Sequence, residues 1–222
     1  GCRPRATVPA GRAADGASAG PEASAAEMDP LHPWVGKGAV LAAAVALVAI
    51  RAPHGHRSTK VPVAESRKGR AEVVLLTFAW VSFFVPILWM ASPLLDAADY
   101  PLHPAALAAG VACYAAGLWL FHRSHADLST NWSITLEVRE GHRLVTEGVY
   151  RRVRHPMYSA LLLFSLGQAL CGANWVAGPS YLAVMLPLVL LRLGPEEAMM
   201  RARFGAEWDA YAARTPRLIP SY

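Results

Sequence analysis

Hydrophobic residues are concentrated in five runs separated by polar segments. The runs lie at roughly 34–50, 73–92, 104–121, 157–172 and 175–192. A helix that spans a bilayer needs about 20 mostly apolar residues, so the second and third runs fit and the first is marginal. Only Gly172-Ala173-Asn174 separates the last two runs, which predicts a tight turn between antiparallel helices. The pattern predicts an all-α, polytopic membrane bundle of about five transmembrane helices.

Composition supports a membrane protein. The 222 residues are 54% hydrophobic and only 17% charged, with a net charge of +5, whereas soluble domains carry about 25% charged residues. The basic residues are spread over the loops, which suits anionic lipid and gives no reason to expect nucleic acid. Residues 1–30, rich in Ala, Gly, Ser and Pro, predict a disordered leader.

Charges in the loops predict the orientation of the helices. The loop after the first run and the loop at 122–156 are rich in Arg and Lys, whereas the loop around Asp96 and Asp99 has neither. Positive loops stay on the cytoplasmic side. We therefore expect a multi-pass membrane protein with the third loop and the C-terminal tail in the cytoplasm, where a site built from them would face.

The stretch 147–158 joins the third loop to the fourth apolar run. Pro156 suits the first position of a helix, where its missing N–H costs nothing, and such a helix start favours an anionic ligand. Arg154 and His155 come just before it, and Tyr150 and Tyr158 flank it. The alternative interpretation is that Arg151, Arg152 and Arg154, together with the two tyrosines, only anchor the chain at the membrane interface.

The tail after residue 192 carries a second polar cluster. Pro195 can open a new helix with Glu196 and Glu197 in its first turn. If the preceding helix continues through Gly194-Pro195 instead, Arg192 and Glu196 lie four residues apart on one face. An amphipathic helix at the interface is predicted by a stripe at helical spacing, formed by Met200, Phe204, Trp208 and Tyr211.

Three other motifs give little evidence about function. His122 and His125 have a spacing that could bind metal, but no third ligand stands nearby, so no metal is predicted. The triplet Asn131-Trp132-Ser133 falls on the predicted cytoplasmic side, where glycosylation is not expected. No strand is followed by Gly-x-Gly-x-x-Gly, which excludes a Rossmann cofactor domain.

The two polar clusters together resemble the isoprenylcysteine carboxyl methyltransferase family, integral membrane enzymes that use S-adenosylmethionine. The resemblance lies between about 131 and 220. Its matching residues are His142-Arg143-Leu144-Val145, Gly148-Val149-Tyr150, Arg154-His155-Pro156-Met157-Tyr158, Arg192, Glu196-Glu197, Phe204-Gly205, Tyr211 and Pro216-Arg217-Leu218-Ile219-Pro220. It divides the chain after the leader into N-terminal transmembrane helices at 31–125 and a catalytic methyltransferase region at 126–222.

The resemblance implies a site for S-adenosylmethionine and a substrate contact. The implied cofactor-binding residues are Thr135, His142, Arg143, Leu144, Val145, Tyr150, His155, Pro156, Met157, Tyr158 and Glu196. Arg192 is the implied substrate contact, and Arg192 and Glu196 are the implied catalytic pair. The implied reaction is methyl transfer to the carboxylate of an isoprenylcysteine or another lipophilic acceptor drawn from the membrane. Because a carboxylate is already ionised at neutral pH, no general base is required.

Three other functions are compatible with parts of the sequence. A phospholipid N-methyltransferase shares the arrangement of cofactor residues but must deprotonate its amine nucleophile. Membrane sterol reductases, which use NADPH, have a comparable Arg-His motif and a tail resembling Trp208, Tyr211 and Ile219-Pro220-Ser221-Tyr222. A membrane scaffold without enzymatic activity would leave His155, Tyr158 and Glu196 without a shared purpose.

Overall fold

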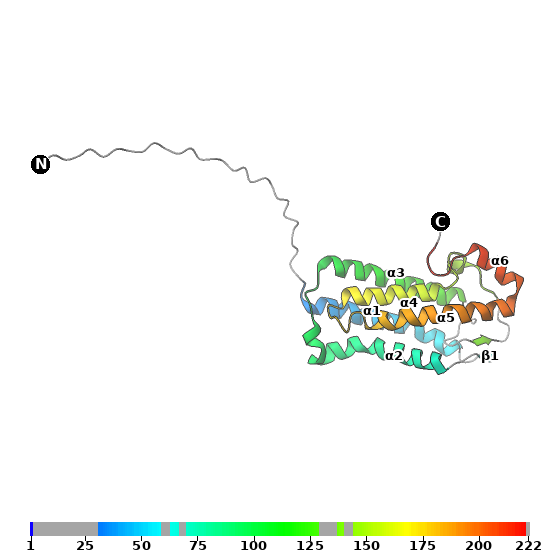
Figure 1. Ribbon diagram of the computed structural model, residues 1–222, viewed down its shortest axis with the longest axis horizontal. Helices are drawn as coiled ribbons and strands as arrows, with labels where there is room; N and C mark the ends of the chain where they lie inside the picture. The colour runs from blue at the N-terminus through cyan, green and yellow to red at the C-terminus, as the bar shows by residue number, and fades with distance from the viewer. Residues whose placement is uncertain (2–30, 59–62, 67–69, 129–136, 140–143, 221–222) are drawn as a thin grey trace.

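In the part of the chain that the structure describes, five long α-helices run side by side, and a short sixth α-helix lies near the C-terminus (Figure 1). The computed structural model describes Gly1 and residues 31–58, 63–66, 70–128, 137–139 and 144–220. The α-helices are α1 (Pro33–Ser58), α2 (Arg70–Ala91), α3 (Pro104–Leu128), α4 (Pro156–Cys171), α5 (Ser180–Phe204) and α6 (Ala206–Arg214). The smaller elements are the 3-10 helices η1 (Pro93–Ala98) and η3 (Gly148–Arg151) and the strands β1 (Val63–Ser66) and β2 (Glu137–Arg139).

The predicted all-α class is confirmed, with one addition. Strands β1 and β2 pair antiparallel, with Ser66 opposite Glu137, a pairing that the hydrophobic pattern did not predict. The leader at 2–30 and the Asn131-Trp132-Ser133 triplet lie outside the described residues.

Among the described residues, three helical segments are long and apolar enough to cross a membrane, namely Pro33–Pro53, Val73–Ala91 and Pro104–Leu128. The first of them is longer than the marginal run at 34–50. Helix α4 is apolar but has only 16 residues. The count of five spans therefore stays a prediction.

The turn between α4 and α5 differs from the predicted tight turn. Helix α5 begins at Ser180, five residues later than the apolar run. The cause is the buried side chain of Asn174, whose Oδ1 accepts hydrogen bonds from the backbone N–H groups of Val176 and Ala177 at 3.0 and 2.8 Å. Such a side-chain turn holds the backbone out of the helix.

The same asparagine joins this turn to the preceding connection. Its Nδ2 donates to the carboxylate of Asp99 at 2.6 Å, and that carboxylate also accepts a hydrogen bond from Trp89 Nε1 at 2.7 Å. Two connections and the end of α2 are therefore fixed to each other at the end of the bundle opposite α6.

Helix α5 continues through Gly194-Pro195 as far as Phe204. The prediction that a new helix opens at Pro195 is therefore wrong, and Arg192 and Glu196 lie four residues apart on one helix. A proline inside a helix removes one backbone hydrogen bond. The helix nevertheless persists here because Glu196 and Glu197, in the turn after the proline, are held by side chains from α4, its preceding loop and the tail.

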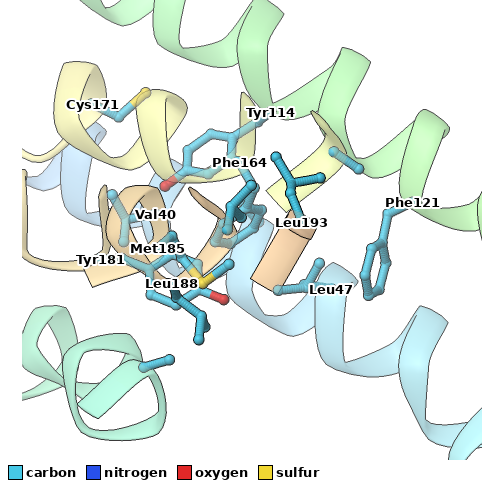
Figure 2. Packing of buried hydrophobic residues seen from close by; sticks show 14 residues of the cluster. Val40, Leu47, Tyr114, Phe121, Phe164, Cys171, Tyr181, Met185, Leu188 and Leu193 are labelled. Carbon is cyan, nitrogen blue, oxygen red and sulfur yellow. The ribbon is translucent and has the colours of Figure 1, made fainter. Parts of the chain in front are cut away.

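Helices α3 and α4 pack most closely, because glycines stand where they cross. A Cβ atom built on Gly110 would lie 2.4 Å from Cys171 Sγ, and one on Gly117 would lie 3.0 Å from the Ala160 carbonyl oxygen. The aromatic core fills the adjacent space (Figure 2), where the rings of Tyr114 and Phe164 meet edge to face at 4.9 Å. Small residues that let backbones approach are typical of helix packing in membranes.

Two glycines of α1 provide a matched test of this packing. We predict that Gly36→Ala lowers the thermal unfolding midpoint in detergent, since the new methyl would lie 2.4 Å from the Cys171 carbonyl oxygen. Overpacking of this kind costs about 1–3 kcal/mol. Gly38→Ala, with no atom within 4 Å, should leave the midpoint unchanged or raise it. Equal midpoints for the two variants would contradict the close approach of α1 to the end of α4.

Candidate functional site: a cavity with an apolar and a polar end

One cavity of about 750 Å³ lies between the helices and reaches the loop before α4. Its apolar walls come mainly from α1, α2 and α5, with residues such as Leu41, Val45, Val48, Ala79, Trp80, Phe83, Phe84, Met185 and Leu188. Its polar lining consists of Arg51, Tyr150, Arg154, His155, Tyr158, Tyr181, Arg192, Glu196, Trp208 and Tyr211. Binding sites for small molecules have volumes of about 300–1,000 Å³ and combine apolar walls with a few polar groups.

The loop before α4 is fixed by the C-terminal tail. Pro156 is the first residue of α4, as predicted, and His155 is its N-cap. The backbone N–H groups of Arg154 and His155 donate to the carbonyl oxygens of Pro216 and Arg217 at 2.8 and 2.9 Å. Ser159 Oγ, one turn into α4, donates to the Leu218 carbonyl at 2.6 Å. The tail therefore holds the residues at the entry of α4 in place.

Glu197 contacts two arginines and one histidine at this point. Its carboxylate lies 2.9 Å from Arg154 Nη2, 3.2 Å from His155 Nε2 and 2.9 Å from Arg217 Nη2. Burial alone would raise the pKa of Glu197, but the hydrogen bonds from His155 and Arg217 and the charge of Arg154 outweigh it and lower the pKa to about 2. Glu197 is therefore ionised at neutral pH and fixes α5 to the loop and the tail.

Arg154 connects Glu197 to the C-terminal end of α6. Its Nη1 atom donates to the carbonyl oxygens of Ala212 and Thr215 at 2.6 and 2.8 Å, and its guanidinium lies 6.0 Å from the ring centre of Trp208. Those carbonyls belong to the last turn of α6 and the residue after it, where a cation is favoured by the helix dipole. Arg154 is thus a structural clamp rather than an open anion contact.

Glu196 points into the cavity, unlike its neighbour Glu197. Its Oε2 accepts a hydrogen bond from the Tyr158 hydroxyl, and its side chain remains 30% exposed. The rings of His155 and Tyr158 stack at 5.6 Å. Arg192, one turn before Glu196 on α5, is 9% exposed and interacts with Tyr158. Because α5 is continuous, a cation and an anion share one wall of the cavity.

Tyr150 is held in place through its backbone. Its carbonyl oxygen accepts a hydrogen bond from the Tyr211 hydroxyl at 2.6 Å. The preceding turn depends on Asp127, whose carboxylate accepts the Val149 N–H at 2.9 Å. Gly148 allows that approach, since it has φ +60° and a Cβ there would lie 2.1 Å from Asp127 Oδ2.

Nine of the residues predicted from the sequence line this single cavity. They are Leu144, Val145, Tyr150, His155, Pro156, Met157, Tyr158, Arg192 and Glu196. Thr135, His142 and Arg143 lie outside the described residues. His122 and His125 do not line the cavity, and no group of three metal-binding side chains occurs within the described ranges.

Sequence reasoning missed other residues. Arg51 lines the cavity from α1, although in the sequence it belongs to a basic loop that served only to predict the orientation of the helices. Asp127 was missed because it is 21 residues from the glycine it supports. The clamp formed by Glu197 was missed as well, because the sequence shows only a second acidic residue beside Glu196.

Comparisons with known proteins support the predicted resemblance. Residues 105–207 match the family model described as phospholipid methyltransferase. Protein-S-isoprenylcysteine O-methyltransferase B of Arabidopsis thaliana is 34% identical over 87 residues, which are 39% of this chain and 44% of that protein. The human protein-S-isoprenylcysteine O-methyltransferase is 32% identical over 95 residues, 43% of this chain and 34% of that one.

Two further likenesses are weaker. A delta(14)-sterol reductase of Mus musculus is 28% identical over 102 residues, 45% of this chain and 24% of that protein. A solved structure of a eukaryotic intramembrane Ras methyltransferase, isoprenylcysteine carboxyl methyltransferase, superposes with a TM-score of 0.48 at 24% identity, over 69% of this chain and 53% of that one.

The matched region is thus similar to membrane methyltransferases. Within that class, the predicted resemblance to the isoprenylcysteine carboxyl methyltransferase family is confirmed. The aligned segments span less than half the length of these curated relatives, so the activity of the whole protein is a matter of proposal.

The ionisation of Glu197 gives a prediction with a defined pH dependence. Because its pKa falls from an ordinary 4.5 to about 2 on folding, its stabilising effect is complete above the unfolded pKa and is lost as the pH falls towards 2. We expect Glu197→Gln to lower the unfolding midpoint most above about pH 6. The difference in unfolding midpoint between this variant and the unsubstituted protein should become smaller as the pH falls from about 5 to 3.

The exposed Glu207 of α6 offers a control, since Glu207→Gln should shift the midpoint little at any pH. A midpoint difference for Glu197→Gln that stays constant down to pH 3 would contradict the ionic clamp. Thermal unfolding in detergent, followed by circular dichroism, measures both variants.

Proposed function

We propose that this protein is an integral membrane methyltransferase that uses S-adenosylmethionine to methylate the carboxylate of an isoprenylcysteine or a similar lipophilic acceptor. One observation carries the proposal: a single cavity joins long apolar walls to an end that holds His155, Tyr158, Arg192 and Glu196. The resemblance of residues 105–207 to methyltransferases supports it.

The apolar walls suit an acceptor that comes from the bilayer. Several wall residues are also exposed on the surface of the bundle, among them Val45 at 61%, Trp80 at 59% and Phe84 at 47%. In a membrane these side chains face lipid tails, so an isoprenoid chain exchanges one apolar environment for another on entering between α1 and α2. The tail stays anchored while its carboxylate reaches the polar end.

The polar end has groups that fit S-adenosylmethionine. That molecule carries a carboxylate, an ammonium and a sulfonium, and Glu196 offers a partly exposed carboxylate that can pair with a cation. The faces of Tyr150 and Tyr158 can stabilise positive charge. Residues proposed to hold it are Thr135, His142, Arg143, Leu144, Val145, Tyr150, His155, Pro156, Met157, Tyr158 and Glu196.

The residues of this chain would act chiefly by positioning. When bound, S-adenosylmethionine supplies an electrophilic methyl group. Arg192 would orient the acceptor carboxylate, Tyr158 would fix the direction of Glu196, and the clamp at Glu197 would keep His155 and Tyr158 in register. Because the acceptor is ionised near neutral pH, no side chain must remove a proton. Alignment of this kind can contribute about 7–11 kcal/mol to lowering a barrier.

The proposed topology follows from the same division of the chain. Residues 31–125 would anchor the protein, and residues 126–222 would form the catalytic region. The polar end, with α6 lying along the interface, would face the cytoplasm. Accessibility of single cysteines placed near α6 to an impermeant thiol reagent tests that orientation.

A phospholipid N-methyltransferase is the second candidate, favoured by the description of the matching family model. Its amine nucleophile must lose a proton, so its rate would rise with pH through the range where the amine titrates, whereas a carboxylate acceptor gives a flat profile. The sterol-reductase likeness leaves NADPH as the ligand to test beside S-adenosylmethionine.

Binding and turnover together test the roles proposed for Arg192 and Glu196. We expect Glu196→Ala to weaken binding of labelled S-adenosylmethionine by about tenfold or more, the loss of a charged contact. Arg192→Ala should bind it normally but lose most of its catalytic efficiency towards a prenylcysteine. The exposed Glu207→Ala is the matched control for both.

Undiminished efficiency of Arg192→Ala would refute the role of that arginine. Binding of NADPH without S-adenosylmethionine would instead favour the reductase. Folding of each variant is checked by its unfolding midpoint.

A further inference from the structure

Helix α6 covers the polar end of the cavity. Its Trp208 and Tyr211 are buried and line that cavity, whereas Glu207, Asp209 and Arg214 on the same helix are exposed. One face of α6 is therefore turned inward over the site, and the other faces away from it.

A single glycine joins α6 to the long helix α5. Gly205 has φ +53° and ψ −124°, a conformation that a residue with a side chain adopts only under strain. A Cβ atom built on Gly205 would have no atom within 4 Å, so the glycine serves the turn of the backbone and not close packing. The chain can change direction at this residue, between two helices that are otherwise regular.

Polar contacts hold α6 over the site. Across the glycine, Arg201 Nε lies 2.7 Å from Asp209 Oδ1, and these side chains are 64% and 55% exposed. On the inner face, the Tyr211 hydroxyl donates to the Tyr150 carbonyl oxygen at 2.6 Å, and Arg154 donates to carbonyl oxygens at the end of α6. Groups of this kind can exchange a protein partner for water, so each contact stabilises the closed position only modestly.

A charged methyl donor needs a polar route to its site. The walls between α1, α2 and α5 are apolar, and a charged group that passes along them would lose its hydration. At the polar end, Tyr150 and His155 are buried together with the two rings of α6. A donor that arrives from water therefore has to displace part of this cover.

We propose that α6 is a lid that opens about Gly205 and admits the methyl donor from the aqueous side. Trp208 and Tyr211 form the inner face of the lid, and the ion pair between Arg201 and Asp209 keeps it closed. Lids that move about a few residues at the end of an element control access to many active sites. The identity of the ligand rests on the proposed function, but the movement does not.

The tail beyond α6 limits how far the lid moves. The carbonyl oxygens of Pro216 and Arg217 are bound by the loop before α4, and those hydrogen bonds need not break. Thr215, which follows α6, has an extended backbone. The lid is thus a flap held at both ends, with Gly205 at one and Thr215 at the other.

A fixed cover makes a different prediction. If α6 stays on the bundle until the whole protein unfolds, loss of the pair between Arg201 and Asp209 lowers the unfolding midpoint and nothing else. Access to the cavity then follows global unfolding, and the rates of ligand binding and release do not rise together.

Thiol labelling measures the opening without any ligand. Met199→Cys places a thiol at a buried position that lines the cavity, where a charged, water-soluble reagent reaches it once the polar end opens. Mass spectrometry of the labelled peptide separates this site from the native cysteines. In this background we expect Asp209→Asn to raise the labelling rate about two- to fivefold, as for loss of an exposed ion pair. Gly205→Ala should raise it about fivefold or more, because the closed turn is strained.

Glu207→Gln is the matched control. Glu207 and Asp209 both lie in the first turn of α6, so each substitution removes one favourable charge from the helix start, but it is Asp209 that contacts Arg201. Glu207→Gln should leave the labelling rate unchanged. Unfolding midpoints show that every variant is folded.

Ligand kinetics give a second readout. We expect Asp209→Asn to raise the association and dissociation rates of labelled S-adenosylmethionine by similar factors, so that Kd stays within about twofold, because the ion pair lies outside the cavity and affects only the opening. A bound donor should also slow labelling of the thiol introduced by Met199→Cys.

The outcomes separate this inference from the proposed function. If Asp209→Asn accelerates labelling, while S-adenosylmethionine neither slows it nor is turned over, the lid stands and the proposed function fails. If methyl transfer occurs but labelling is equal in Asp209→Asn and Glu207→Gln, or follows only the unfolding midpoint, the lid is overturned. Labelling of Met199→Cys as fast as that of an exposed thiol also overturns it.

Discussion

The ionic clamp centred on Glu197 is the interaction on which the arrangement of the site depends. One carboxylate on α5 contacts Arg154 and His155 from the loop before α4 and Arg217 from the tail. Arg154 and His155 lie 43 and 42 residues before Glu197, and Arg217 lies 20 residues after it, so apolar packing alone would not set the register of these segments. Loss of one partner from a buried ionic cluster leaves a charge unpaired and destabilises the fold. The clamp therefore favours the one arrangement of α5, the loop and the tail in which all its partners meet.

The clamp also explains why neighbouring acids have different roles. Glu197 contacts Arg154, His155 and Arg217, which leaves Glu196 partly exposed in the cavity with Tyr158 as a partner. The continuous α5 then carries Arg192 into the same wall. Helices α3 and α4 pack closely through glycines on one side of the bundle, while α1 and α2 line the apolar side of the cavity. The polar end of the cavity is thereby joined to its apolar walls.

Much of this could be read from the sequence, and the reasons are local. Pro156 at a helix start and the run of apolar residues after it follow rules of helix capping and periodicity, and nine predicted residues line one cavity. What could not be read depends on contacts across the chain. The late start of α5 follows from the side chain of Asn174, the support of Gly148 from Asp127, and the position of Arg51 from how α1 packs.

The central claim is that one cavity brings a methyl donor to a lipophilic carboxylate. It is tested most directly by incubating the purified protein in detergent with S-adenosylmethionine labelled in its methyl group and a prenylcysteine acceptor, then treating the lipid product with alkali. The account predicts label that is released as volatile methanol, because a methyl ester is cleaved by base. Label confined to a base-stable product, or no transfer by protein that binds both ligands, would contradict it.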